Sequence, residues 1–281
     1  MLAPLTDEGM DAMARELTVG IAGLGAIGLH LARAIDAGVP GLRLVAVAAR
    51  DHAKAERNLA SFRDKPAIVS IAALGACDVV VEAAPAAIFE QVATAAIEGG
   101  KIFIPSSVGA LLPRMHLVER AKETGARIIV PTGALLGLDA VRAAAEGEVE
   151  SVTIETRKPP LGLAGAPYLD LHKIDVTTIT TPTMVFKGNA FDAAQGFPAN
   201  VNVAAALALA GIGPERTMVE IWADPAQTRN KHTIRVEAAA ARLTMTIENV
   251  PSEENPRTGK ITPLSVLACL RGLTATLKVG T

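Results

Sequence analysis

The stretch TVGIAGLGAIGLHLARAI, residues 18–35, joins a short apolar run to an amphipathic run through three glycines. Gly23, Gly25 and Gly28 form the pattern Gly-x-Gly-x-x-Gly. Between a strand and a helix, the first glycine permits a tight turn, the second lets the backbone approach a pyrophosphate, and the third allows close helix packing. Unpaired N–H groups and the helix dipole then bind the phosphates. The stretch therefore predicts a dinucleotide site; the alternative is a glycine-rich turn with no ligand.

Two further residues belong to this predicted site because of their position in the turn. Ala26 and Ile27 lie between the second and third glycines, so we expect their backbone to contact the cofactor. Residues 18–22 are apolar and β-prone, and residues 27–35 carry apolar side chains at helical spacing. The context is thus the strand–turn–helix unit that the glycine pattern requires.

The rest of the first half continues this alternation of strand and helix. Continuous apolar runs, rather than alternating ones, are typical of strands covered on both faces. Short connections to the intervening helices favour an α/β fold with a Rossmann-like, doubly wound parallel sheet. The predicted strands are residues 18–22, 42–49, 78–84, 101–105 and 126–130, and the predicted helices are 27–35, 51–62, 86–98 and 113–124.

The second half has a different pattern, which predicts a second, α+β domain. Several strands follow one another without intervening helices, and this arrangement favours an antiparallel sheet. The predicted strands are residues 149–156, 217–223, 231–238 and 241–250, and the predicted helices are 199–210 and 262–273. We expect a dinucleotide-binding domain over residues 1–134 and a substrate and dimerisation domain over 135–261. The C-terminal segment 262–281 is expected to pack back on the first domain.

Composition excludes several classes of protein. The chain has 281 residues, a net charge of -2 and only 3% aromatic residues, which argues against a nucleic-acid surface. No uncharged apolar stretch is long enough to span a membrane, and the acidic first residues do not resemble a signal peptide. Cys77 and Cys269 lie far apart and predict buried small hydrophobes rather than a disulfide framework. We expect a cytoplasmic protein with no metal site.

Arg50 bears on the choice of cofactor. An acidic residue at the end of the second strand usually binds the ribose 2′-hydroxyl of NAD, but this chain has Arg50 there and Asp51 one position late. A guanidinium at this position can pair with a 2′-phosphate. The sequence therefore favours NADP, or the use of both NADP and NAD, over NAD alone. A solvated charge at the strand end is the alternative interpretation of Arg50.

Five histidines are candidates for proton transfer: His30, His52, His116, His172 and His232. Reaction at a nicotinamide requires a group in the cleft between the domains, and only His172 and His232 lie in the second half. From the residues alone, a structural or surface histidine is the more common case for both. His172 has Asp170 and Asp175 nearby, but three such residues in a loop do not define a metal site.

Several motifs, taken in order along the chain, resemble the L-aspartate dehydrogenases. They are far more specific than the glycine pattern, and together they cover most of the chain from about residue 18. They are the glycine turn at 23–28, IIVPTGALLGLDA (128–140), FPANVNVAAALALAG (197–211), NKHTI (230–234) and PSEENPRTGKITPLS (251–265).

The resemblance implies both an activity and the residues that carry it. Such enzymes oxidise L-aspartate to iminoaspartate with NAD or NADP, and the resemblance implies a homodimer. It also implies that His232 is the catalytic histidine, and that Ala134 and Asn202 contact the cofactor near the nicotinamide. Asn200 is the more favourable helix cap, because it lies nearer the helix start. The cation that binds the substrate carboxylates is left open between Lys158, Arg229 and Lys231.

Two alternatives remain at this stage. A related two-domain reductase of another imine or β-carbonyl acid, similar to homoserine dehydrogenase or dihydrodipicolinate reductase, would have the same architecture. A non-catalytic NADP-sensing protein would bind the cofactor without turnover. If the protein oxidises L-aspartate, as the resemblance implies, its expected role is the supply of iminoaspartate for NAD biosynthesis, although reductive amination of oxaloacetate is chemically possible.

Overall fold

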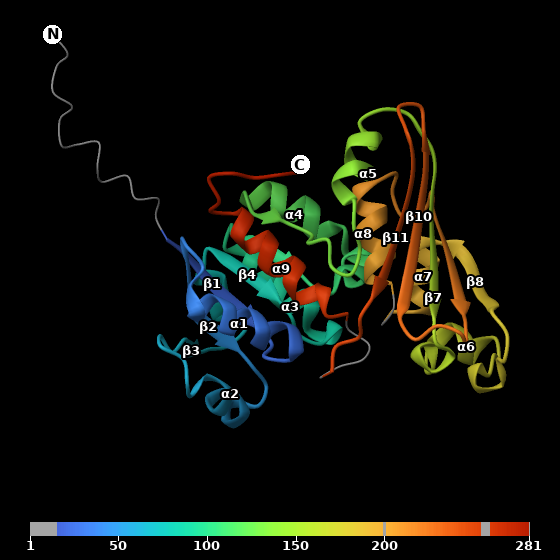
Figure 1. The fold of residues 1–281 in the computed structure, drawn as a ribbon. Coiled ribbons are helices and arrows are strands. Elements are labelled where there is room, and N and C mark those ends of the chain that lie inside the picture. The colour runs from blue at the N-terminus through green and yellow to red at the C-terminus, as the bar shows by residue number, and fades with distance from the viewer. Residues whose placement is uncertain (1–15, 199–200, 254–258, 281) are drawn as a thin grey trace, which may run out of the picture.

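The computed structural model describes residues 16–198, 201–253 and 259–280, which form two lobes (Figure 1). The first lobe is built on a six-stranded sheet in the order β3-β2-β1-β4-β5-β6. Every pairing in this sheet is parallel, so the predicted doubly wound Rossmann-like sheet is confirmed. Its strands are β1 (Leu17–Ala22), β2 (Leu42–Ala48), β3 (Ala67–Ile68), β4 (Val79–Glu82), β5 (Ile102–Pro105) and β6 (Arg127–Ile128).

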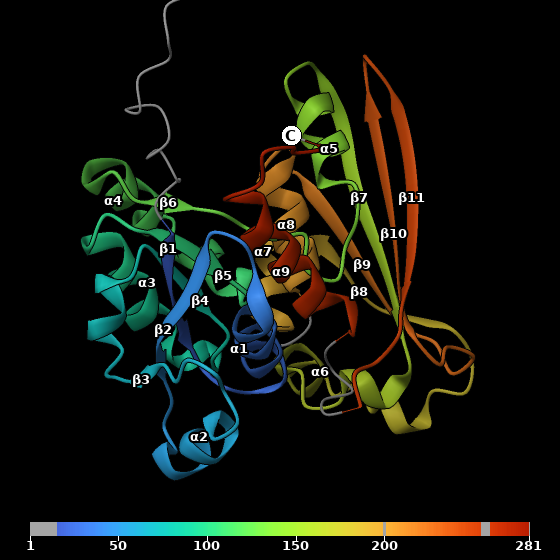
Figure 2. The same ribbon diagram turned by 60° about the vertical axis from the view of Figure 1, so that its left-hand side comes forward.

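Helices cover both faces of this sheet because its strands are apolar on both sides (Figure 2). Leu31 and Ile35 of α1 pack with Val19 and Ile21 on one face. Phe89 of α3 packs on the other face in a separate buried cluster. The helices of this lobe are α1 (Ala26–Gly38), α2 (His52–Leu59), α3 (Phe89–Glu98) and α4 (His116–Thr124).

Three of the predicted helices are shorter than the sequence suggested. Residues 86–88 and 112–114 form separate 3-10 turns, so α3 and α4 begin three residues later than predicted. Asp51 is the N-cap of α2 and accepts a hydrogen bond from the amide of Lys54, so this helix begins at the next residue. Capping groups and turns, which leave little trace in apolar periodicity, set these ends.

The second lobe contains a five-stranded sheet in the order β11-β10-β7-β9-β8. The predicted antiparallel sheet is wrong in one respect, because β7 and β9 run parallel. The chain crosses between them through β8 and three helices, and β8 is a strand that the sequence pattern did not predict. The strands are β7 (Val149–Lys158), β8 (Thr183–Asn189), β9 (Thr217–Ala223), β10 (Asn230–Ala238) and β11 (Arg242–Asn249).

Helix α8 lies between the two lobes and is apolar on all sides beyond its first residue, Asn202. Leu207 packs with the five-stranded sheet, whereas Ala205 and Ala206 pack with Val108 and Leu112 of the first lobe. A helix that is buried on both sides needs no polar face. The helices of this half are α5 (Leu138–Ala145), α6 (Pro167–Leu171), α7 (Ala190–Gly196), α8 (Asn202–Ala210) and α9 (Ile261–Gly272).

The C-terminal helix α9 returns to the first lobe. Val266 and Leu270 share a buried cluster with Leu31 and Ile35 of α1. Asn249 at the end of β11 and Ser265 of α9 both contact the linker that joins the lobes after β6. The described part of the chain contains no helix long and apolar enough to span a bilayer.

Candidate active site

A cavity of about 610 Å³ lies between the two lobes. One wall comes from the carboxyl ends of the parallel strands and the start of α1, and the other comes from α8 and the five-stranded sheet. In parallel sheets ligands bind at this edge, where the strand order reverses. Four of the sequence-predicted site residues line the cavity together: Ile27, Ala134, Asn202 and His232.

The floor of this cavity is a polar part of the second sheet. His232 pairs with Thr156 across β10 and β7. Asn249 pairs with Asn230 across β11 and β10. Lys158 lies two residues beyond Thr156 on β7, so its side chain points to the same face. These residues bring donors, an acceptor and a base into one small area. We call the five the polar floor: Thr156, Lys158, Asn230, His232 and Asn249.

His232 is held in the neutral form. Its side chain is 3% exposed, and its Nδ1 atom lies 2.9 Å from the hydroxyl oxygen of Thr156. Burial, with a smaller contribution from the charge of Lys158, lowers the pKa of His232 to about 3. Because Thr156 engages Nδ1, the Nε2 atom is the one left for a ligand. In the tautomer whose Nδ1–H donates to Thr156, the unprotonated Nε2 atom of this neutral imidazole can accept a proton.

Lys158 is the cation of the polar floor. It is 6% exposed and lines the cavity. Of the other two candidates, Lys231 is adjacent to His232 on β10, so strand alternation points its side chain to the opposite sheet face, where it pairs with Glu248 at 3.2 Å. Arg229 is exposed and does not line the cavity.

The glycine turn between β1 and α1 has the geometry that a pyrophosphate needs. Gly23 has a φ of +91°, which L side chains rarely adopt, and a side chain there would meet the backbone of Ala83. A Cβ atom on Gly28 would strike the carbonyl oxygen of Gly23, whereas one on Gly25 would meet nothing within 4 Å. Only Gly25 faces open space, and the helix that begins at Ala26 has no side-chain cap for its first N–H groups. These features fit a phosphate group at this turn.

Arg50 lies outside the central cavity, two residues after the end of β2. Its side chain is exposed at the same sheet edge as the glycine turn. The carboxylate of the next residue, Asp51, is already engaged as the N-cap of α2. The end of this strand therefore offers a guanidinium, rather than an available acid, to the adenosine side of a cofactor.

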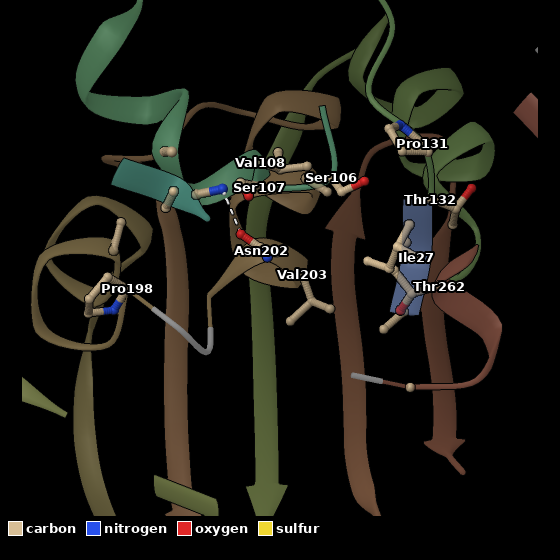
Figure 3. Close-up of a pocket in the computed structure, with 18 of the residues that line it drawn as sticks. Ile27, Ser106, Ser107, Val108, Pro131, Thr132, Pro198, Asn202, Val203 and Thr262 are labelled. Carbon is tan, nitrogen blue, oxygen red and sulfur yellow. Dashed lines mark hydrogen bonds between the residues drawn. The ribbon is translucent and has the colours of Figure 1, made fainter. Parts of the chain in front are cut away.

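Asn202 links the two lobes at the cavity. Its Oδ1 atom accepts a hydrogen bond from the amide of Gly109 at 2.9 Å (Figure 3). The side chain thus spans from the start of α8 to the 3-10 turn that follows β5, and it does not cap its own helix. Asn200, the predicted cap, lies outside the described residues. The Nδ2 group of Asn202 is left to donate, because the oxygen is engaged.

The linker between the lobes is held from both sides. Ser265 of α9 accepts a hydrogen bond from the amide of Gly133 at 2.9 Å. The Nδ2 group of Asn249 donates to the carbonyl oxygen of Ala134, also at 2.9 Å. These contacts, made by residues far along the chain, fix the backbone of a segment that lines the cavity.

Glu82 organises the other side of the cavity. This carboxylate is fully buried at the end of β4. It accepts hydrogen bonds from the amides of Ala84, Ser106 and Ser107, and from the hydroxyl of Ser107, at 2.9–3.2 Å. Burial raises the pKa of Glu82, although these hydrogen bonds oppose the shift. The backbone donors of Ser106 and Ser107 therefore serve Glu82.

The remaining histidines do not contribute to the cavity. His172 stacks on Tyr168 with ring centroids 4.1 Å apart, and His116 lies 3.7 Å from Glu90 at the surface. His30 and His52 are exposed on α1 and α2. Among the described residues, no three His, Cys, Asp or Glu side chains are grouped to hold a metal ion.

The fold and the cavity define a two-domain oxidoreductase of the dinucleotide-binding class. The family model for the NAD-binding domain of homoserine dehydrogenase matches residues 23–131. The model described as aspartate dehydrogenase, C-terminal, matches residues 139–273. The myo-inositol dehydrogenase of Lactobacillus casei, whose structure holds NAD(H) and myo-inositol, shares the fold at 15% identity, a TM-score of 0.54, and coverage of 91% of this chain and 84% of that one.

The particular family follows from closer relatives. The chain is 54% identical to the L-aspartate dehydrogenase of Bradyrhizobium diazoefficiens, over 95% of both proteins. It is 44% identical to that of Methanocella arvoryzae, over 94% of this chain and 99% of the relative. The crystal structure of aspartate dehydrogenase from Thermotoga maritima matches with a TM-score of 0.71 at 27% identity, covering 94% of this chain and 99% of that one. The chain belongs to the L-aspartate dehydrogenase family.

Proposed function

We propose that the protein oxidises L-aspartate to iminoaspartate with a nicotinamide dinucleotide, and that His232 is the catalytic base. The observation that carries the proposal is the joint position of His232 and Lys158 on the polar floor of a cavity beside a dinucleotide-type turn. The relatives named L-aspartate dehydrogenase support the choice of substrate.

The chemistry requires the removal of a hydride from Cα and a proton from nitrogen. The cofactor, when bound, supplies the acceptor for the hydride; the glycine turn, Ala134 and Asn202 would hold it. The substrate ammonium gives a proton to Nε2 of His232, and the remaining nitrogen electron pair forms the C=N bond as the C–H electron pair leaves. Neutral His232 is the form that accepts this proton. Removing such a base costs on the order of 10² to 10⁴ in rate.

Lys158 is the proposed partner of a substrate carboxylate. A buried ammonium group in the cavity attracts a dicarboxylate and compensates part of the cost of burying it. The bound anion also offsets the field that Lys158 exerts on His232, so the imidazole becomes a stronger base when substrate is present. Oxidation and the reverse reaction, reductive amination of oxaloacetate, use the same groups. The supply of iminoaspartate for NAD biosynthesis is the role we favour.

The test of this activity is a substrate panel. Wild-type protein is incubated with NADP or NAD and with L-aspartate, homoserine or malate, and reduced cofactor is followed by absorbance; a cyclic imine and aspartate semialdehyde test the reductive direction. Rapid turnover confined to L-aspartate supports the proposal. Activity with another substrate would favour one of the related reductases, and cofactor binding without turnover would favour a sensing protein.

We further propose a preference for NADP, or use of both cofactors, through Arg50. The Arg50→Ala variant is expected to raise the KM for NADP about tenfold or more and to leave the KM for NAD within about twofold, since a charge-assisted bond to the 2′-phosphate is lost. Arg43→Ala, at the opposite end of β2, is the matched control and should alter neither. An unchanged KM for NADP in Arg50→Ala would reject the assignment.

The assembly and location belong to the same proposal. We propose a homodimer and a cytoplasmic protein whose domains are divided near residues 134 and 261. The uncovered face of the second sheet supports self-association, because the described helices of this lobe pack on the other face (Figure 1). Equilibrium sedimentation tests the proposed homodimer directly: a monomer at micromolar concentration would contradict it.

A further inference from the structure

The amide side chain of Asn249 lies in the wall of the cavity, with its nitrogen hydrogen-bonded and its oxygen buried without a partner. Asn249 is 3% exposed and lines the cavity. Its Nδ2 group donates to the carbonyl oxygen of Ala134, and this bond fixes which end of the amide faces the linker. Its Oδ1 atom is buried and has no hydrogen-bond partner. A buried carbonyl oxygen in this state is costly unless a ligand donates to it.

The surroundings of Oδ1 restrict what that ligand group can be. Asn249 lies directly opposite Asn230 on β10, and His232 is two residues further along the same strand. Lys158, on the neighbouring strand β7, lines the same cavity. Carboxylate oxygens are attracted to the lysine, whereas Oδ1 accepts only from a donor. An amino acid with a carboxylate and an ammonium group carries both kinds of partner.

Gly259 closes the opposite side of the asparagine. A Cβ atom added there would lie 3.2 Å from Oδ1, so the backbone of this residue already packs against Asn249. The hydrogen bond to Ala134 on one side and the backbone of Gly259 on the other therefore restrict the orientation of the amide. An acceptor that is fixed before the ligand arrives discriminates strongly against ligands that lack the matching donor.

We propose that Asn249 is a specificity-determining residue whose Oδ1 atom accepts a hydrogen bond from the α-amino group of the substrate. The proposal rests on the dehydrogenation of L-aspartate given above. In this arrangement Asn249 orients the nitrogen from which His232 removes a proton, while Lys158 binds a carboxylate. The same residue, through Nδ2, ties the amino-group site to the linker at Ala134.

The test compares two ligands that differ at the amino group. L-aspartate and succinate share both carboxylates, but succinate has no donor on its α-carbon. In Asn249→Leu, which keeps the branched outline without polar atoms, the KM for L-aspartate is expected to rise tenfold or more. The inhibition constant of succinate should change less than about threefold. Asn249→Asp keeps an acceptor oxygen. It should bring the ratio of the KM for L-aspartate to the inhibition constant of succinate most of the way back to the wild-type value.

A matched control separates substrate binding from support of the linker. Ser265→Ala removes the other hydrogen bond to the linker, at Gly133, and does not remove an acceptor from the cavity. It should shift the constants for L-aspartate and succinate by similar factors. The proposal would be overturned if Asn249→Leu and Asn249→Ala changed the KM for L-aspartate and the inhibition constant of succinate by equal factors. It would also be overturned if Asn249→Asp changed these constants in the same way as Asn249→Leu and Asn249→Ala. Absence of L-aspartate oxidation in the wild type would instead reject the underlying activity.

Discussion

His232 shows how a residue acquires a role from its surroundings. The residues alone left it as one of two candidates, with His172, and only the resemblance to a family selected it. The structure adds the physical cause, because burial beside Lys158 keeps the imidazole neutral and Thr156 fixes its orientation. Asn249 had no signal in the sequence at all, since its position depends on strand register and on a contact with residue 134, more than 100 positions away.

The lowered pKa of His232 predicts a pH-dependent loss of stability. Between its ordinary pKa of 6.5 and about 3, the unfolded chain binds a proton at this residue and the folded chain does not. Acidification in this window therefore favours unfolding by about 1.4 kcal/mol for each pH unit. A His232→Gln variant lacks this contribution, so its free energy of unfolding should fall less steeply than that of the wild type. Urea titrations at pH 7.5, 6.5 and 5.5 without ligand measure the difference; parallel curves would contradict it.

The glycines of the first turn predict two different phenotypes. Gly25 has an ordinary φ of -80° and open space where a side chain would lie, so Gly25→Ala should keep the fold and raise the Kd for the dinucleotide at least tenfold. Gly28→Ala drives a methyl group into the backbone of Gly23 and should destabilise the protein by about 3 kcal/mol or more. Thermal unfolding and cofactor fluorescence titration give both values. A Gly25→Ala variant that binds normally would show that no phosphate approaches this turn.

At the level of elements, continuous apolar runs predicted the parallel sheet, because strands buried on both faces have few other compositions. The same approach missed β8 for a physical reason. Its register shifts between Met184 and Phe186, so the adjacent residues Val185 and Phe186 are both buried and no alternation appears. Without β8, the parallel pairing of β7 with β9 was hidden as well.

Replacing Glu82 is expected to weaken the two loops whose amides donate hydrogen bonds to its carboxylate. Each carboxylate oxygen accepts two hydrogen bonds, so the NH₂ group of Glu82→Gln must face donors on one side. We expect a destabilisation of about 1–3 kcal/mol and weaker cofactor binding, since both loops line the cavity. Glu98→Gln, which alters an exposed ion pair with Arg120, should cost less than about 1 kcal/mol. Equal effects of the two changes on urea midpoint and Kd would contradict this role of Glu82.

At the scale of the whole molecule, the cavity exists because distant segments meet. The linker after β6 is held by Ser265 and Asn249, and α8 joins the lobes through the bond from Gly109 to Asn202. Sequence motifs marked most of these segments, but their spacing along the chain carried no information on which atoms would face one another. The register of β7, β10 and β11, set by folding, supplies that information.

The most direct test of the account is the comparison of wild type with His232→Ala in two measurements on one preparation. The Kd for NADPH, from fluorescence titration, should stay within about threefold. The kcat for NADPH formation from L-aspartate should fall by a factor on the order of 10² to 10⁴. Retained turnover in the folded variant, or loss of cofactor binding together with activity, would contradict the assignment of His232 as the base of the reaction.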